Sequence, residues 1–90
     1  MASKSKLQKF AELASNPIVL EKNPAFKGKW NTDFFKNQHP IVLELACGKG
    51  DYTLGMARLF PEKNFIGADI KGNRIWSAAR IAGIENLQNV

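Results

Sequence analysis

The sequence predicts an α/β protein in which parallel strands alternate with helices. Two apolar runs of strand length, residues 41–45 and 64–70, are each followed by a segment with helical spacing of apolar residues. A glycine-containing loop joins the first run to its helix. The 90 residues suit about one of the two βαβαβ halves of a doubly wound nucleotide-binding domain. We therefore expect only the first part of such a domain.

Residues 1–40 are expected to form a basic helix and arm ahead of that domain. A helix is predicted from Lys4 to Ser15, and Asn16-Pro17 ends it. Its apolar face is predicted at helical spacing: Leu7, Phe10, Ala11 and Ala14. Residues 16–40 are predicted to be irregular because breakers recur there: Pro17, Pro24, Gly28 and Pro40.

Residues 41–90 are expected to form the first half of the domain. Residues 41–45 predict a buried parallel strand, residues 46–50 a tight loop, and Asp51–Phe60 a helix that Pro61 ends. Residues 64–70 predict a second strand, and 73–82 a second helix with Gly83 as its C-cap. Asn89-Val90 resembles the entry to a third strand. The residues predicted to face inward are Leu54, Ala57, Phe60, Ile75, Ala78, Ala79 and Ala82.

Charge and composition narrow the classes of function. Residues 1–40 hold seven lysines against three acidic residues, whereas residues 41–90 are nearly balanced. This excess suits a polyanionic partner such as nucleic acid or, equally, a solvated lysine-rich face. No apolar run approaches the roughly 20 residues that span a bilayer, and no secretory signal is present. Cys47 is the only cysteine, which fits a reducing, cytoplasmic compartment.

The loop after the first strand is the candidate ligand site. Gly48 and Gly50 lack a Cβ, so the backbone there is expected to approach a ligand closely. The helix that follows offers unpaired N–H groups to an anion. Asp69 ends the second predicted strand, 19 residues after Gly50, close to the spacing at which an acid accepts hydrogen bonds from ribose. The alternative for Asp69 is a cap on the second helix.

Two common nucleotide motifs do not fit this loop. A dinucleotide fingerprint needs glycine or alanine three residues after its second glycine, where this chain has Thr53 or Asp51. A P-loop needs Ser or Thr after Gly-Lys, where this chain has Gly50. A nucleoside without pyrophosphate remains. S-adenosylmethionine is favoured because Glu44 and Asp69 flank the loop with negative charge that suits a cationic ligand.

Residues 41–50 (IVLELACGKG) resemble motif I of class I methyltransferases, and the chain is more narrowly similar to the bacterial tRNA (guanine-N7-)-methyltransferase family. The supporting segments are Phe26-Lys27-Gly28-Lys29-Trp30, Phe34-Phe35, Gly48-Lys49-Gly50-Asp51, residues 64–71 (NFIGADIK) and Arg74. The resemblance implies the first part of a Rossmann-like class I methyltransferase fold. It implies methyl transfer from S-adenosylmethionine to N7 of a guanine in tRNA.

Site residues follow from the resemblance together with the loop pattern. The candidate cofactor-binding residues are Glu44, Ala46, Cys47, Gly48, Gly50, Asp69 and Ile70. Candidate contacts to the RNA are Lys27, Lys29, Lys49, Lys71 and Arg74. No metal site is expected. The family usually carries glycine where this chain has Ala46. Alanine is expected to be tolerated there if the local φ is negative, with its methyl group crowding the cofactor as the alternative.

Several alternatives remain open at this stage. Cys47 is expected to pack rather than to act as a nucleophile, since no histidine lies near it in the sequence. Trp30 is expected to anchor the arm, and Trp76 to pack on the second helix. The chain alone is expected to be inactive. A non-catalytic binding module, or a class I methyltransferase that acts on another substrate such as rRNA, is the alternative function.

Overall fold

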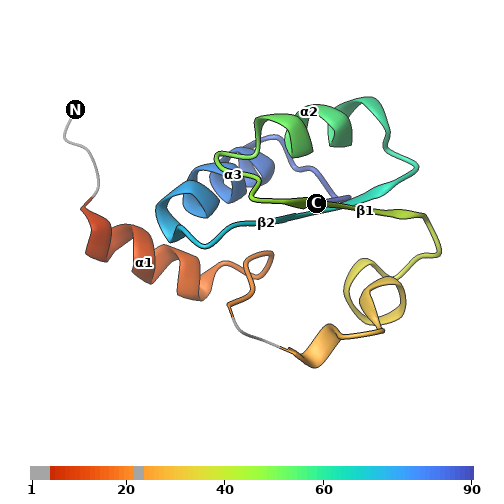
Figure 1. Ribbon diagram of the computed structural model, residues 1–90, viewed down its shortest axis with the longest axis horizontal. Coiled ribbons are helices and arrows are strands. Elements are labelled where there is room, and N and C mark those ends of the chain that lie inside the picture. The colour runs from red at the N-terminus through yellow and green to blue at the C-terminus, as the bar shows by residue number, and fades with distance from the viewer. Residues whose placement is uncertain (1–4, 22–23) are drawn as a thin grey trace.

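The computed structural model describes residues 5–21 and 24–90, and its helices and strands alternate as predicted (Figure 1). The elements are α1 (Lys6–Ser15), η1 (Pro24–Phe26), η2 (Trp30–Phe35), β1 (Ile41–Leu45), α2 (Asp51–Leu59), β2 (Asn64–Ala68) and α3 (Gly72–Ile84). The predicted α/β class, the first strand and the start of the first helix after it are confirmed. The strand at 64–70 ends two residues earlier than predicted.

β1 and β2 pair in parallel, with Ile41 opposite Asn64 and Leu45 opposite Ala68. Successive side chains of a strand point to opposite faces of the sheet. Phe65 is 2% exposed on the face that α2 covers, whereas Leu43 and Leu45 are 57% and 74% exposed. In Figure 1, α2 lies above the strands, and η1 and η2 lie below the amino end of β1. The sheet is therefore covered mainly on one face.

The buried core joins both crossover helices to the sheet. Leu54 and Ala57 of α2 and Ala79 and Ala82 of α3 are buried, as their spacing predicted, and they pack with the buried Phe65 of β2. The other predicted inward residues are half-buried: Phe60, Ile75 and Ala78. Small residues on α3 permit this close packing, because a helix needs short side chains where its backbone approaches a neighbour.

The last residues return beside β2. The Phe65 N–H donates to the Asn89 carbonyl at 2.7 Å, and the buried Asn89 amide donates to the carbonyls of Ala57, Phe60 and Lys63. Through these hydrogen bonds Asn89 connects the end of α2 to the start of β2. Within the described residues no third strand is formed, and Asn89-Val90, which resembled the entry to one, lies beside β2 through the bond from Phe65.

The predicted apolar face of α1 is confirmed for Phe10, which packs against Gly72 of α3, and is wrong for Leu7, Ala11 and Ala14, which are exposed. Ser5 caps the helix in a reciprocal pair with Gln8, and Lys4 lies outside the described residues. Leu13, not Leu7, is the buried side chain: Leu13 is 2% exposed and Leu7 81%. On this face Phe10 and Leu13 pack against Gly72 at the start of α3, and Glu12 accepts a hydrogen bond from the Trp76 indole.

The described residues of 16–40 are irregular as predicted, except for the two short helices η1 and η2. Phe26, Trp30 and Phe34 recur every four residues, and their rings gather with centroids 5.3–5.6 Å apart. Phe35 joins them, with its centroid 5.0 Å from Phe34. Trp30, Phe34 and Phe35 line a cavity of about 140 Å³ together with β2 residues such as Phe65, so this cluster holds the arm against the sheet. Trp30 is thus in the packing position predicted for it.

The predicted C-cap of the second helix is wrong as well. α3 runs through Gly83 to Ile84, and the left-handed residue after it is Asn86, with φ of 53°. The Leu87 N–H donates to the Ala82 carbonyl at 2.9 Å and closes the helix end. Asn tolerates the left-handed region better than most residues, so it can replace glycine there.

Candidate ligand-binding site at the carboxyl ends of the strands

Two connections meet at the carboxyl ends of β1 and β2. One is the loop 46–50 into α2, and the other is the turn 69–71 into α3. The Cys47 N–H donates to the Ala68 carbonyl at 2.9 Å, and the Gly48 N–H donates to Asp69 Oδ2 at 2.9 Å. These bonds hold the loop and the turn together, in the position where parallel α/β sheets bind ligands.

Asp69 faces the loop, as predicted. Its Oδ1 accepts from the Lys71 N–H at 2.8 Å, and Arg74 Nη1 lies 3.9 Å from Oδ2. The Asp69 side chain is only 4% exposed. Hydrogen bonds from the Lys71 and Gly48 N–H groups lower the pKa of this carboxyl against the opposing effect of burial, so it is ionised at neutral pH.

These same bonds explain why β2 ends early. The Asp69 carboxylate binds the Lys71 N–H two residues on, which bends the chain away from the strand direction before Ile70. Asp69 is not the N-cap of α3, because that position is Lys71, which has no side-chain cap bond. The carboxylate instead bridges two connections that are 21 residues apart in the sequence.

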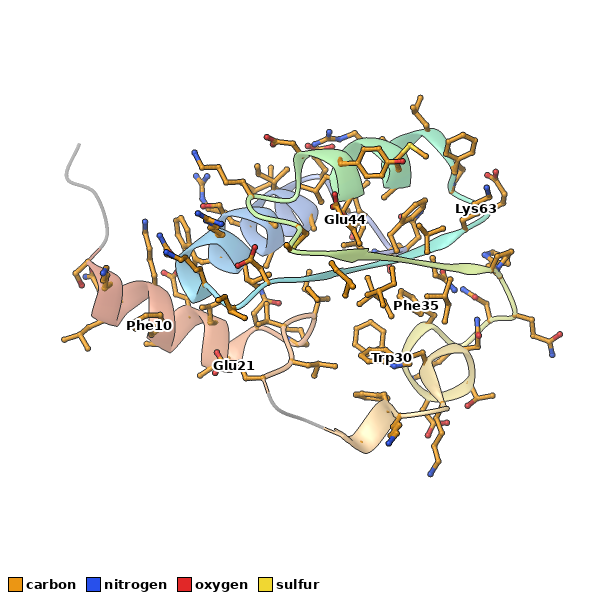
Figure 2. All side chains as sticks on the ribbon, in the orientation of Figure 1. Phe10, Glu21, Trp30, Phe35, Glu44 and Lys63 are labelled. Carbon is orange, nitrogen blue, oxygen red and sulfur yellow. The ribbon has the colours of Figure 1, made fainter. Side chains whose placement is uncertain are left out.

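Glu44 lies on the other side of the loop, half-buried between β1 and α2 (Figure 2). The Thr53 hydroxyl of α2 donates to Glu44 Oε1. Thr53 is 4% exposed, so this hydroxyl is held by the surrounding packing. Sequence reasoning missed Thr53. The only signal for it was its place in the first turn of the helix after the loop, where side chains can reach the end of the preceding strand.

Gly48 and Gly50 have different roles, although the sequence predicted one. Both have positive φ, 59° and 79°. Open space lies where a Cβ of Gly48 would be, whereas a Cβ on Gly50 would lie 2.8 Å from Ala78 Cβ. The prediction that a missing Cβ at Gly50 leaves room for a ligand is therefore wrong. Gly50 lets the loop pack on α3, and Gly48 remains open at the site.

Ala46 does not have the negative φ that would make alanine relaxed at this position. Its φ is 54°, in the left-handed region, and the residue is exposed to solvent. Left-handed backbone costs a residue with a Cβ about 1–2 kcal/mol relative to the right-handed form. Ala46 thus holds a strained conformation at the first position of the loop, where glycine would be relaxed.

Cys47 behaves as a packing residue. Its Sγ lies 2.9 Å from where a Cβ of Gly67 would be, so the thiol packs against the backbone of β2. Burial, followed by the negative charges of Asp69 and Glu44, raises the pKa of the thiol. A protonated thiol is a poor nucleophile. The geometry therefore supports the packing interpretation over a catalytic one.

The amino end of α2 presents unpaired donors to the loop. The Leu54 N–H makes the first bond of the helix, to the Gly50 carbonyl at 2.7 Å. The N–H groups of the preceding turn, from Asp51 to Thr53, therefore have no intrahelical acceptor. Gly50, the N-cap, provides no side-chain cap. Such an end favours an anionic group such as a carboxylate.

The turn after β2 exposes both apolar and basic side chains. Ile70 is 97% exposed, and Asp69 and Ile70 line one end of a groove of about 590 Å³ that continues along residues 18–21 and Phe10 of α1. Lys49, Lys71 and Arg74 are exposed around the same turn.

Lys27 and Lys29 lie elsewhere in the fold. Both are exposed, on the segment between η1 and η2 near the amino end of β1 (Figure 1). The structure therefore separates the predicted RNA contacts into two groups, with Lys49, Lys71 and Arg74 at the carboxyl ends of the strands.

Residues 5–21 and 24–90 contain neither a cluster of metal-ligating side chains nor a membrane-spanning helix. No His, Cys, Asp and Glu side chains in these ranges gather as three or more potential metal ligands. None of the helices there combines the length and apolar character needed to cross a membrane.

Comparison with known proteins gives consistent matches. A family model described as "Putative methyltransferase" matches residues 38–90. A tRNA (guanine-N(7)-)-methyltransferase of Bacteroides thetaiotaomicron is 52% identical over 97% of this chain and 38% of its own length. Proteins of the same name from Christiangramia forsetii and Porphyromonas gingivalis are 50% and 59% identical, over 100% and 71% of this chain and 44% and 26% of their own lengths. The chain thus spans less than half the length of these relatives.

Proposed function

The chain belongs to the methyltransferase family whose model matches residues 38–90, and from this membership we propose that it is the cofactor-binding front part of a tRNA guanine-N7 methyltransferase. Residues 41–90 are the proposed S-adenosylmethionine-binding half-domain, and residues 1–40 a basic helix and arm beside it. The observation that carries the proposal is the bond from the Gly48 N–H to Asp69, because it sets an ionised carboxylate at the mouth of an open glycine loop.

The residues present fit S-adenosylmethionine. Asp69, ionised at the end of β2, suits the ribose hydroxyls, since a carboxylate has acceptor capacity beyond its two backbone bonds. Glu44 suits the ammonium and sulfonium charges, and the free N–H groups at the start of α2 suit the carboxylate. The exposed Ile70 offers an apolar surface to an adenine ring. When bound, the cofactor supplies an electrophilic methyl group on sulfur.

The proposed reaction requires no proton transfer by the protein before the methyl group is attacked. N7 of guanine has a free lone pair, and no proton must leave before it attacks the methyl group. A strong general base is unnecessary, so catalysis rests on alignment of the two reactants, which can supply several kcal/mol. The protonated Cys47 is consistent with this, since the proposed reaction needs no protein nucleophile.

The proposed partner is tRNA, and the proposed compartment is the cytoplasm. The relatives named above carry tRNA in their names, and the basic excess of residues 1–40 suits a polyanion. Lys49, Lys71 and Arg74 are the proposed contacts nearest the cofactor site. Lys27 and Lys29 are proposed contacts at the amino end of the strands.

A chimera tests this function. Residues 1–90 replace the aligned segment of the Bacteroides thetaiotaomicron relative, and transfer of labelled methyl groups to unmodified tRNA is measured. We expect label in guanine N7. Asp69→Asn and Glu44→Gln are expected to reduce the transfer about tenfold or more, because each removes a charged acceptor. Glu62→Gln, at an exposed acid outside the site, is the matched control and should not change it. An active parent and an inactive, folded chimera would refute the proposal.

A further inference from the structure

Positive charge is concentrated on two packed helices. α3 carries Arg74 and Arg80 and no acidic residue along its 13 residues. α1 carries Lys6 and Lys9, with Glu12 as its one acidic residue. The two helices pack against each other and lie at the same end of the molecule (Figure 1). At this contact Lys9 of α1 and Arg80 of α3 both lie over the Trp76 ring, so these two cations come together.

The Trp76 side chain forms the seam between these helices. Lys9 Nζ lies 4.7 Å from the Trp76 ring centroid, and Arg80 Cζ lies 5.8 Å from it. The Trp76 indole N–H donates to the carboxylate of Glu12. The Glu12 carboxylate is therefore hydrogen-bonded within the half-buried contact between the two helices. Lys6 and Arg80 are exposed to solvent.

This surface adjoins the proposed cofactor site. Arg74, near the start of α3, lies 3.9 Å from Asp69 and is about half exposed. From Arg74 to Arg80 the helix rises about 9 Å and turns by about 240°. Arg74 therefore lies toward the proposed cofactor site and Arg80 toward the contact with α1. Glu85, just after α3, is paired with Arg58 of α2 at 2.6 Å and so adds little free negative charge.

We propose that Lys6 and Lys9 of α1 with Arg74 and Arg80 of α3, here called the α1–α3 surface, bind the phosphate backbone of the RNA beside the cofactor site. Charge complementarity carries this inference, since backbone contacts by Lys and Arg position a nucleic acid without reading its sequence. The inference rests on the proposed function. It adds Lys6, Lys9 and Arg80 to the contacts and gives α1 a role in binding the substrate.

Anisotropy of a fluorescently labelled, unmodified tRNA transcript tests the surface over a salt series. In the double variant Lys6→Gln, Arg80→Gln, each removed phosphate contact is expected to lower the affinity for tRNA about fivefold to tenfold at low salt. The slope of log affinity against log salt should fall by about one per contact. Lys6→Arg with Arg80→Lys keeps the charge and should bind like the parent. Lys63→Gln is the matched control, because Lys63 lies at the opposite end of the molecule from Phe10 of α1 (Figure 2).

Binding of S-adenosylhomocysteine by the same variants separates this inference from the proposed function. Unchanged cofactor binding with weakened tRNA binding supports the surface, and circular dichroism verifies that each variant is folded. An unchanged salt slope in a folded double variant overturns the surface and leaves the function standing. Three other results also overturn the α1–α3 surface. They are an equal loss of tRNA binding in Lys63→Gln, no tRNA binding by the unsubstituted chain, and binding to phosphatidylserine vesicles in place of tRNA.

Discussion

Replacing Ala46 with glycine is expected to stabilise the fold. Ala46 begins the loop after β1 with φ of 54°, a conformation that strains any residue with a Cβ. The residue is exposed, so removing its methyl group loses little buried contact. Most alanine-to-glycine changes destabilise a protein, which makes the opposite sign at this position a specific consequence of the backbone geometry.

The expected gain follows from two opposing effects. Relief of the left-handed strain stabilises the folded state by about 1–2 kcal/mol. The greater conformational freedom of glycine stabilises the unfolded chain by about 0.4–1 kcal/mol, which opposes this gain. The midpoints of these two ranges differ by about 0.8 kcal/mol, so the free energy of unfolding should rise by about that amount. With a urea dependence of about 1 kcal/mol per molar for a small protein, the unfolding midpoint should move up by about 0.8 M.

Urea unfolding followed by circular dichroism measures this change. Ala11→Gly is the matched control, since Ala11 is exposed in the interior of α1 and the same chemical change there should cost about 1 kcal/mol. Opposite shifts of the two midpoints confirm the reasoning. A neutral or destabilising effect of Ala46→Gly would refute it, because the strain would then have no energetic consequence.

Three further predictions use the same site. Gly50→Ala should lower the free energy of unfolding by about 2 kcal/mol or more in urea, because its new methyl group meets Ala78 at 2.8 Å in left-handed backbone; an unchanged midpoint contradicts this. The lowered pKa of Asp69 stabilises the fold above its unfolded pKa of about 3.9, and this is lost as pH falls through the lower folded pKa; Asp69→Asn should therefore flatten the dependence of the urea midpoint on acidic pH. The raised pKa of Cys47 predicts slower alkylation by iodoacetamide at neutral pH than for a free cysteine, with a rate that rises in alkali, and rapid reaction at neutral pH would count against it.

Local sequence patterns predicted the elements that position the site. β1 and β2 were recognisable because each is a short apolar run, and the loop because it concentrates small residues. Asp69 could be placed at the loop from its spacing alone, since parallel strands bring their carboxyl ends together. These features depend on short segments and on a topology with few alternatives.

Features that depend on contacts between distant segments could not be predicted in this way. The buried face of α1 packs on α3, where Glu12 accepts a hydrogen bond from Trp76, 64 residues along the chain. Gly50 packs on α3 in a way that became visible only when Ala78 was placed beside it. The aromatic cluster around Trp30 was predictable from its spacing, but the neighbouring prolines and glycines directed the interpretation toward irregular structure.

The most direct test of the proposed site is a nuclear magnetic resonance titration of this chain with S-adenosylhomocysteine. Amide resonances report weak as well as tight binding residue by residue. The account predicts that the largest shifts fall on residues 46–53 and 69–71, and that Asp69→Asn diminishes them. Absence of shifts in these segments, or shifts confined to the arm at residues 24–40, would contradict the assignment of the loop as a cofactor site.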